Sequence, residues 1–372
     1  MKITMFDAGN GDCILIQSSS SNILIDGGTA GSFDNWYEEI KKLGCIDALF
    51  ITHIDSDHTN GIIKLLEKNK TDENPIEIKK IYFNGIEQLF SDEFGSLVEC
   101  SELDDKFDSI NACFEEVTER ENIGFDHGTS LSYILSDTDN VNSTIIHDKT
   151  FDEPIKIGDF SIKVISPTVS HMNELKESWK EILIERKIKK KILTKNHTIA
   201  FETYINSLNE KISEASEIAD EIYSTIDEYA NSEYKPDSSL ANLTSLSFLI
   251  ECEGRTFLML GDVHIETVCE WMNGKELSVD ALKVSHHGSK SNLNKEFLKL
   301  LDCNKYLIST NGKIYKHPNL ETLSRIAKFS KKAETTIFIN NNINHITEEV
   351  VDMFNKYKNK TIIKMGRKEV NL

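Results

Sequence analysis

The sequence is poor in proline and has no closely spaced cysteines, and each absence excludes a class of protein. Only five of its 372 residues are proline, while 39% are hydrophobic and 28% are charged. This composition excludes collagen-like, proline-rich and fully disordered chains. The seven cysteines stand singly without a CxxC pair, so we expect reduced thiols and neither a disulfide framework nor a cysteine zinc site.

Long apolar runs are absent as well. A segment of about eighteen or more apolar residues would be needed to span a bilayer, and none occurs. The first residues, MKITMFDAG, alternate like a strand and do not form a secretion signal. We therefore expect a soluble, cytoplasmic protein with no membrane partner. The net charge of −19 disfavours a surface that attracts nucleic acid everywhere, but it permits a local basic patch.

Strand-like runs alternate with amphipathic helical stretches near both ends of the chain, which predicts a mixed α/β fold. The helical stretches span residues 36–43, 62–67 and 320–329. The predicted strands span residues 3–6, 14–17, 23–26, 48–52, 247–251, 256–260, 281–285, 306–310 and 336–339. Turns rich in Gly or Asp follow several of these strands, and α/β folds place their chemistry in such turns.

The middle of the chain has a heptad pattern, in which apolar residues recur at alternating spacings of four and three. The seam includes Phe201, Ile205, Leu208, Ile212 and Ile222. Because a weaker pattern precedes it, residues 171–237 are predicted to be a helical hairpin, with its turn near residues 195–197, inserted in one domain of residues 1–372. The basic run RKIKKK at residues 186–191 is either a solvated helix face or a contact for phosphate or an acidic partner.

The segment THIDSDHTNG, residues 52–61, carries a dense group of metal-ligand residue types. It follows an apolar run that is typical of a buried strand, so His53, Asp55, Asp57 and His58 are expected to emerge together on the next loop. Imidazole and carboxylate suit Zn²⁺, Mn²⁺ or Fe²⁺, and this set exceeds what one tetrahedral ion needs. The segment therefore predicts a site for two divalent metals. The alternative is a loop whose His and Asp residues only cap the next helix, but a helix cap does not require two His and two Asp within six positions.

The motif resembles the HxHxDH signature of the metallo-β-lactamase superfamily, with Asp55 in place of the second His. Other segments, in the same order, resemble the soluble hydrolase domain of ComEC-type competence proteins: DAGNGDCILI, LIDGG, LMLGDV, KVSHHGSKS and NGKIYKHP. The resemblance covers both flanks of the chain but not the helical insertion. It implies a metallo-β-lactamase fold with four αββα layers and a metal-dependent hydrolase activity.

The resemblance also implies the remaining metal ligands. Asp262 would bridge both metals, and either His286 or His287 would supply the last ligand, with the choice between them open. Taken alone, Asp262 in its GD turn is more typical of a helix cap. The superfamily usually has one more His before the bridging Asp, but the competence-type form has Asn-x-x-Ser there, which Asn242 and Ser245 match.

The missing mid-chain His leaves two outcomes open for the first metal: it is held weakly, or only one metal is bound at rest, so that one position is partly occupied. Four other histidines do not stand at the expected place: His127, His147, His171 and His197.

Several further residues are candidates for orienting ligands or substrate. Asp26 is expected to line the floor of the site, whereas Asp7 and Asp12 fit this role and a role in tight turns equally well. Asn242 and Ser245 would also act from behind the ligands. His317, in the KHP segment, resembles a residue that faces the substrate phosphate; the alternative is a surface loop histidine.

The resemblance implies a phosphodiesterase or nuclease that uses a metal-activated hydroxide. Asp57 or Asp262 would hold the nucleophile, and His317 or His286 would steady a phosphate oxygen or protonate the leaving group. No GxSxG or GxxxxGK[ST] motif supports a serine hydrolase or a P-loop enzyme. One alternative is a hydrolase of a small phosphoester or choline-type ester. Another is an effector subunit of a multi-protein system, for example in defence, that docks a partner or self-associates through residues 171–237.

Overall fold

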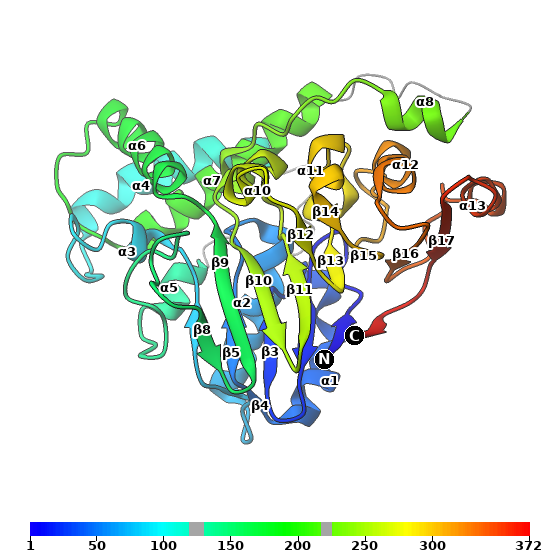
Figure 1. Cartoon of the computed structure of the whole chain (residues 1–372). Helices are drawn as coiled ribbons and strands as arrows, with labels where there is room; N and C mark the ends of the chain where they lie inside the picture. Colours follow the sequence, from blue (N-terminus) through cyan, green and yellow to red (C-terminus); the bar gives the residue numbers. More distant parts are fainter. Residues whose placement is uncertain (119–129, 217–224) are drawn as a thin grey trace.

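The computed structural model describes residues 1–118, 130–216 and 225–372. Two large sheets pack face to face, and helices cover the outer face of each sheet, which gives four αββα layers (Figure 1). This confirms the predicted fold class. Among the described residues, no helix combines the length and the apolar character needed to cross a bilayer.

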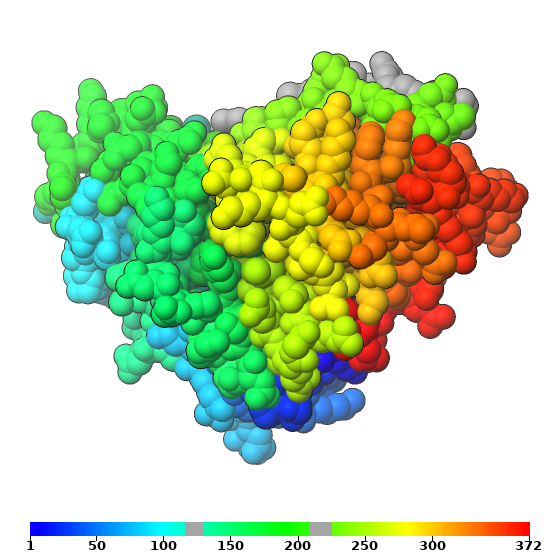
Figure 2. Space-filling view, in the orientation of Figure 1, coloured from blue at the N-terminus to red at the C-terminus, as the bar shows by residue number. Residues whose placement is uncertain are grey.

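The first sheet comes from the N-terminal part of the chain and one C-terminal strand. Its strands, in spatial order, are β18 (Glu369–Asn371), β1 (Lys2–Met5), β2 (Ile14–Gln17), β3 (Asn22–Ile25), β5 (Ala48–Phe50) and β7 (Ile81–Tyr82). Because β18 pairs with β1, the two ends of the chain lie side by side, as the adjoining blue and red surfaces in Figure 2 also show.

The second sheet comes from the remainder of the chain. Its strands, in spatial order, are β17 (Lys360–Lys364), β16 (Glu334–Ile339), β15 (Lys305–Ile308), β13 (Ala281–Lys283), β11 (Arg255–Met259), β10 (Ser247–Cys252), β9 (Phe160–Ser166) and β8 (Ile155–Ile157). Two short pairs flank the sheets: β4 (Cys45–Ile46) with β6 (Glu77–Ile78), and β12 (Leu277–Ser278) with β14 (Leu301–Asp302).

The alternation of side chains along each strand explains the layers. In β2, Ile14 and Ile16 face the second sheet and join a core with Phe248 and Phe257, whereas Leu15 points outward to the helices on the first sheet. Since successive side chains of a strand point to opposite faces, strands that are apolar on both faces must be covered on both sides.

The helices divide between the two outer faces. Those packed on the first sheet, or joined to its outer core, are α1 (Tyr37–Leu43), α2 (Ser56–Thr71), α3 (Ile86–Leu89), α4 (Ser101–Thr118), α5 (Leu131–Leu135), α6 (Val169–Glu185), α7 (Lys195–Ser216) and α9 (Leu240–Leu243). Those on the second sheet are α8 (Ile226–Asn231), α10 (Ile265–Met272), α11 (Lys295–Leu300), α12 (Leu320–Phe329) and α13 (Glu348–Asn355). Two short 3₁₀ helices, Ala30–Asn35 and Ser285–Gly288, complete the set.

The helical insertion differs from the predicted hairpin in two respects. Residues 195–197 are the first turn of α7, so the prediction of a turn there was wrong; the chain reverses over residues 186–194 instead. The main neighbour of α7 is α4, a helix that the sequence pattern did not reveal. Phe201 and Ile205 are buried against this helical layer, so this part of the seam is not left for a partner. The side chains of Ile212 and Ile222 lie outside the described residues.

Candidate metal centre

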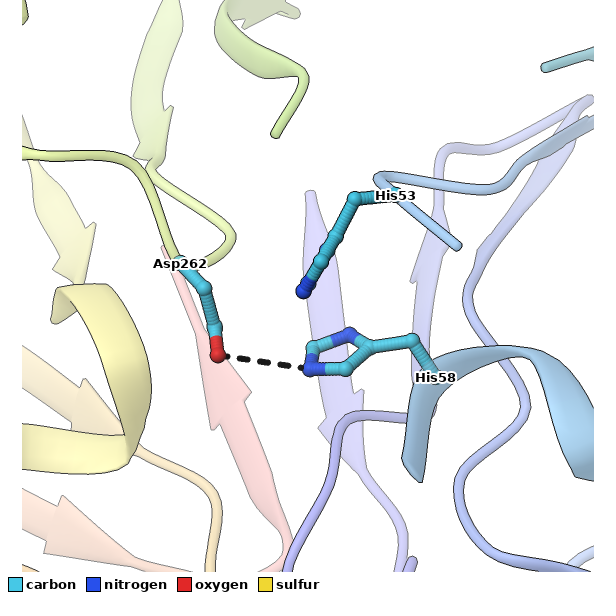
Figure 3. Close-up of side chains that lie close together, drawn as sticks. All are labelled: His53, His58 and Asp262. Carbon is cyan, nitrogen blue, oxygen red and sulfur yellow. Dashed lines mark ion pairs between the residues drawn. The ribbon is translucent and has the colours of Figure 1, made fainter. Parts of the chain in front are cut away.

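A buried cluster of imidazoles and carboxylates forms where the ends of the two sheets meet. His53 follows β5 in the first sheet, and His58 stands in the first turn of α2. Asp262 follows β11 and His287 follows β13 in the second sheet. Figure 3 shows His53 and His58 approaching from one side and Asp262 from the other. The cluster therefore exists only when both sheets are assembled.

The helix that carries part of the cluster begins earlier than predicted. It starts at Ser56 and not at residue 62, so Asp57 and His58 belong to its first turn and the prediction of a loop for all four residues was wrong for these two. The first turn lacks apolar residues and so gives no helical hydrophobic period. The positive end of the helix dipole favours the carboxylate of Asp57 at this position.

Asp262 lies between two groups of donors. Its Oδ2 is 3.5 Å from His58 Nε2 and 3.3 Å from His287 Nε2. His53, His58 and Asp262 form one candidate metal-binding group, and Asp57, His58 and His287 form another, with all ligand atoms of each group within 4.8 Å of one another. A carboxylate in this place can reach ions on both sides.

The cluster passes a test of fit for divalent metals. His53 Nε2, His58 Nε2 and His287 Nε2 are buried and have no hydrogen-bond partner among the described residues, and the same holds for Asp262 Oδ1. Buried polar atoms of a folded protein normally have hydrogen-bond partners, whereas each of these imidazole nitrogens has only a carboxylate oxygen 3.2–3.5 Å away, so they are open to act as metal ligands. Neutral imidazole and carboxylate are the donors that Zn²⁺ and similar ions prefer.

The far nitrogen of each imidazole is held in place. His58 Nδ1 is 2.8 Å from Asp26 Oδ2, His287 Nδ1 is 2.9 Å from the carbonyl oxygen of Ser309, and His53 Nδ1 is 2.9 Å from Thr52 Oγ1. A proton on Nδ1 that is donated to the oxygen leaves the Nε2 lone pair facing the cluster, which is the usual arrangement of metal-ligating histidines.

Electrostatics favour positive charge at the centre of the cluster. Burial lowers the pKa of His287, but the carboxylates of Asp262 and Asp12 have the larger, opposite effect and raise this pKa to about 10. The pKa of His58 is likewise raised well above its ordinary value, because Asp262 and Asp26 outweigh its burial. Divalent ions would satisfy the same carboxylates in place of these protons.

Asp26 lies directly behind the first-sheet ligands. Its carboxylate accepts hydrogen bonds from the backbone N–H and the hydroxyl of Thr52, each at 2.7 Å, in addition to its contact with His58. Asp26 adopts φ 57°, a left-handed conformation that is strained for a residue with a side chain. It is therefore placed directly behind His58, where it can orient this imidazole.

His286 and His287 have different surroundings, although both adopt left-handed backbone conformations, with φ 47° and 53°. His287 takes part in two candidate metal-binding groups, whereas His286 takes part in none. His286 Nδ1 instead lies 3.3 Å from Asp237 Oδ2 and 3.0 Å from Asn292 Oδ1, and its ring centroid is 5.4 Å from that of His317. The geometry thus distinguishes two neighbours that the sequence left equivalent.

Asp237 is a component of the site that sequence reasoning missed. Its carboxylate accepts hydrogen bonds from Asn242 Nδ2 at 2.8 Å, from Asn292 Nδ2 at 3.0 Å and from the backbone N–H of Ser239 at 2.9 Å. It sits in the polar segment KPDSS, which reads as an ordinary turn. Its burial arises from the fold and could not be read from that segment.

Three other residues predicted from the sequence lie around the cluster. Asp55 is the N-cap residue of α2, with Oδ2 3.2 Å from His53 Nε2, but it is absent from the four candidate groups. Ser245 Oγ accepts the backbone N–H of Asp262 at 3.1 Å, which fixes the turn that carries this ligand. Asn242 Nδ2 is 3.3 Å from His286 Nδ1, and Asn242 Oδ1 is buried with no hydrogen-bond partner among the described residues.

The remaining residues named from the sequence differ in their burial and in their distance from the cluster. Asp12 is buried beneath His287, with Oδ1 3.5 Å from His287 Nδ1. Asp7 accepts a hydrogen bond from Asn341 at 3.3 Å and is in none of the four candidate groups. His317 is buried, which excludes a surface loop histidine. The other histidines named from the sequence, His147, His171 and His197, are in no candidate group, and His127 lies outside the described residues.

The αββα layers and the His and Asp cluster at the junction of the sheets define a metallo-β-lactamase fold. Residues 6–144, which contain the first ligand segment, match the family model described as the metallo-beta-lactamase superfamily. This part of the chain is therefore similar to the metallo-β-lactamase superfamily, as the motif indicated.

Two sequence relatives match short stretches. ComE operon protein 3 of Bacillus subtilis (strain 168) is 33% identical over 97 residues, which are 26% of this chain and 12% of that protein. Human microtubule-associated protein 1A is 31% identical over 93 residues, 24% of this chain and 3% of that protein. The chain thus matches only a small part of either relative.

Solved structures also align with the chain, at low identity and low TM-score. The metallo-beta-lactamase fold protein YhfI from Bacillus subtilis aligns with a TM-score of 0.39 and 10% identity, and the alignment covers 100% of this chain and 99% of that chain.

Proposed function

We propose that this chain is a metal-dependent hydrolase of phosphodiester bonds, with nucleic acid as the substrate. The observation that carries the proposal is the set of buried His53, His58 and His287 Nε2 atoms that converge on Asp262 without a hydrogen-bond partner among the described residues. The choice of phosphodiester rests on the motifs shared with competence-type hydrolases, in which DNA is the presumed substrate, and on the position of His317.

The ligands divide into two sets that share Asp262. His53 and His58 would hold one ion, and Asp57, His58 and His287 would surround the other. Because Asn242 stands where the superfamily usually has an imidazole, the first ion would be held more weakly than the second. Divalent ions such as Zn²⁺ or Mn²⁺ would supply Lewis acidity, which activates water and polarises the electrophile.

The protein residues then have separate tasks. The Asp57 side chain is 21% exposed, against 4% for Asp262, so Asp57 is the carboxylate that can orient an attacking water. Asn10 donates a hydrogen bond to Asp57 Oδ2 at 3.1 Å and thereby limits the rotation of this carboxylate. His286 and His317, whose ring centroids lie 5.4 Å apart, are placed to hold the phosphate oxygens and to protonate the leaving oxygen.

The experiment is a comparison of phosphodiester and phosphomonoester hydrolysis by the purified chain. We expect Mn²⁺ or Zn²⁺ to support release of p-nitrophenol from methyl p-nitrophenyl phosphate, and EDTA to abolish it. Asp57→Ala should lower kcat by at least about a hundredfold, because it removes both a ligand and the group that orients water. Asp280→Ala, in an acidic residue paired with Arg255, is the matched control and should keep full activity.

A preference for phosphomonoesters such as p-nitrophenyl phosphate would support the alternative of a small phosphoester hydrolase. Absence of hydrolysis with any of these metals, or full activity of Asp57→Ala, would overturn the proposed function.

A further inference from the structure

An exposed segment runs directly into the candidate site. Lys313, Ile314, Tyr315 and Lys316 are four consecutive exposed residues between β15 and α12, and Ile314 and Tyr315 expose 44% and 36% of their surface. The next residue, His317, is buried beside His286. The Tyr315 ring centroid is 5.7 Å from that of His317, with the rings tilted by 34°. An aromatic ring and two cations thus lie at the rim of the site.

The base of this segment is held rigidly. The backbone N–H of Asn319 donates to the carbonyl of Gly288 at 3.1 Å, and a Cβ on Gly288 would lie 2.6 Å from Pro318 Cβ, so the segment packs against the turn that carries His287. Lys316 adopts φ 51°, a strained conformation that persists only where the surroundings enforce it. The exposed side chains are therefore presented on a fixed support, which lowers the entropic cost of binding.

The segment also carries two cations. The chain has a net charge of −19, and some of its lysines, such as Lys79 and Lys328, pair with carboxylates. Neither Lys313 nor Lys316 forms an ion pair with any residue that the structure describes. Uncompensated cations on an acidic protein attract phosphate to the place where they stand.

Resting on the phosphodiesterase function proposed above, we propose that residues 313–316 form a nucleobase subsite for single-stranded nucleic acid. Tyr315 stacks on the base next to the phosphate held at His286 and His317, and Lys313 and Lys316 neutralise the neighbouring phosphates. A base must leave the duplex stack to lie on an aromatic ring, which selects single strands or frayed ends. Every base has a π face, so the subsite tolerates any sequence.

The test compares two diesters that share one leaving group. Thymidine 5′-(p-nitrophenyl phosphate) carries a base, and methyl p-nitrophenyl phosphate does not. We expect Tyr315→Ala to lower kcat/KM for the thymidine ester by about tenfold, in line with the usual effect of removing a stacking aromatic, and to leave the methyl ester unchanged. Tyr315→Phe should behave as wild type. Tyr133→Ala is the matched control, because Tyr133 has a similar exposure of 37% on α5.

Equal losses on both esters, or no loss on either, would overturn the subsite while leaving the phosphodiesterase intact. If the wild type cleaves neither ester, the proposed function fails. The subsite is then tested separately, by measuring binding of an oligonucleotide. In EDTA, fluorescence anisotropy of labelled hexathymidylate should then show binding to the wild type. Tyr315→Ala should weaken this binding, and the Lys313→Gln, Lys316→Gln double variant should make the affinity less dependent on salt. No binding, or binding indifferent to both variants, overturns the subsite.

Discussion

Lys283 Nζ lies 2.6 Å from Asp12 Oδ2, and both side chains are completely buried. Lys283 belongs to β13 of the second sheet, whereas Asp12 precedes β2 of the first sheet. The pair therefore joins the sheets directly beneath His287. Burial raises the pKa of Asp12, but Lys283 and His287 together hold it below its ordinary value, so the carboxylate stays ionised.

Lys283→Met is expected to destabilise the protein by about 3–5 kcal/mol, since removing one partner leaves an uncompensated buried charge. The measurement is urea unfolding of the metal-free protein. The double variant Lys283→Met, Asp12→Asn should recover part of the loss because both charges are gone. A single variant as stable as wild type would show that the ion pair does not support the junction of the sheets.

Asp26 is expected to control metal affinity through His58. Asp26→Asn should weaken binding of Zn²⁺ by about 10–100-fold, the usual cost of losing a partner behind a metal ligand. Competition with a chromogenic chelator measures this affinity. Asp47→Asn is the control, because Asp47 also accepts a backbone N–H, that of Asn22 at 2.8 Å, but lies outside the cluster. Equal affinities of Asp26→Asn and wild type would contradict the assigned role.

Asp237 is expected to affect turnover and not metal content, because it pairs with His286 and belongs to none of the four candidate metal groups. A hydrogen bond to a charged group contributes about 1.5–3 kcal/mol, so Asp237→Asn should lower kcat by about tenfold or more. Elemental analysis should find the wild-type metal content, and kcat should be measured well below the variant's unfolding temperature. A variant that loses metal in proportion to activity would place Asp237 among the residues that support ligands.

Much of the fold could be predicted because apolar periodicity survives in its strands and helices. The strand Ile14–Gln17 and the helix Leu320–Phe329 match their predicted bounds, and β10, β11 and β15 agree to within two residues at each end. The first turn of α2 was missed because it consists of ligands and polar residues. The helix α4 was missed because its partner, α7, was assigned to a hairpin within the insertion.

The candidate site was predictable where its residues fall in a short motif, as with His53 and His58. It was not predictable where burial depends on distant segments. Lys283 stands in an apolar strand, and only the approach of Asp12 from the other sheet explains a cation there. His286 and His287 are equivalent in sequence; they differ because one faces Asp237 and the other faces Asp262.

A pH-dependent stability is expected from His197, away from the metal centre. Burial lowers the pKa of His197 to about 4, and the Trp179 indole N–H donates to its Nε2 at 3.0 Å, which requires a neutral ring. The unfolded chain takes up this proton near pH 6.5 and the folded chain only near pH 4, so stability falls as pH decreases through this window. The contribution is at most about 3 kcal/mol.

Urea unfolding of the metal-free protein at pH 7 and pH 5 measures this effect. His197→Gln keeps an acceptor for Trp179 but does not titrate, so its stability should fall less than that of wild type between the two values. Parallel losses in both proteins would show that His197 is protonated in the folded state or does not lie against Trp179.

The central claim is that His53, His58, His287 and Asp262 bind divalent metal ions, and metal content measures this most directly. Inductively coupled plasma mass spectrometry of the full chain, after equilibration with Zn²⁺ or Mn²⁺ and desalting, should find at least one ion per chain in the wild type. His287→Ala and His58→Ala should lower the content, and His286→Ala should retain it. A wild type without metal, or a loss with His286→Ala but not with His287→Ala, would contradict the account.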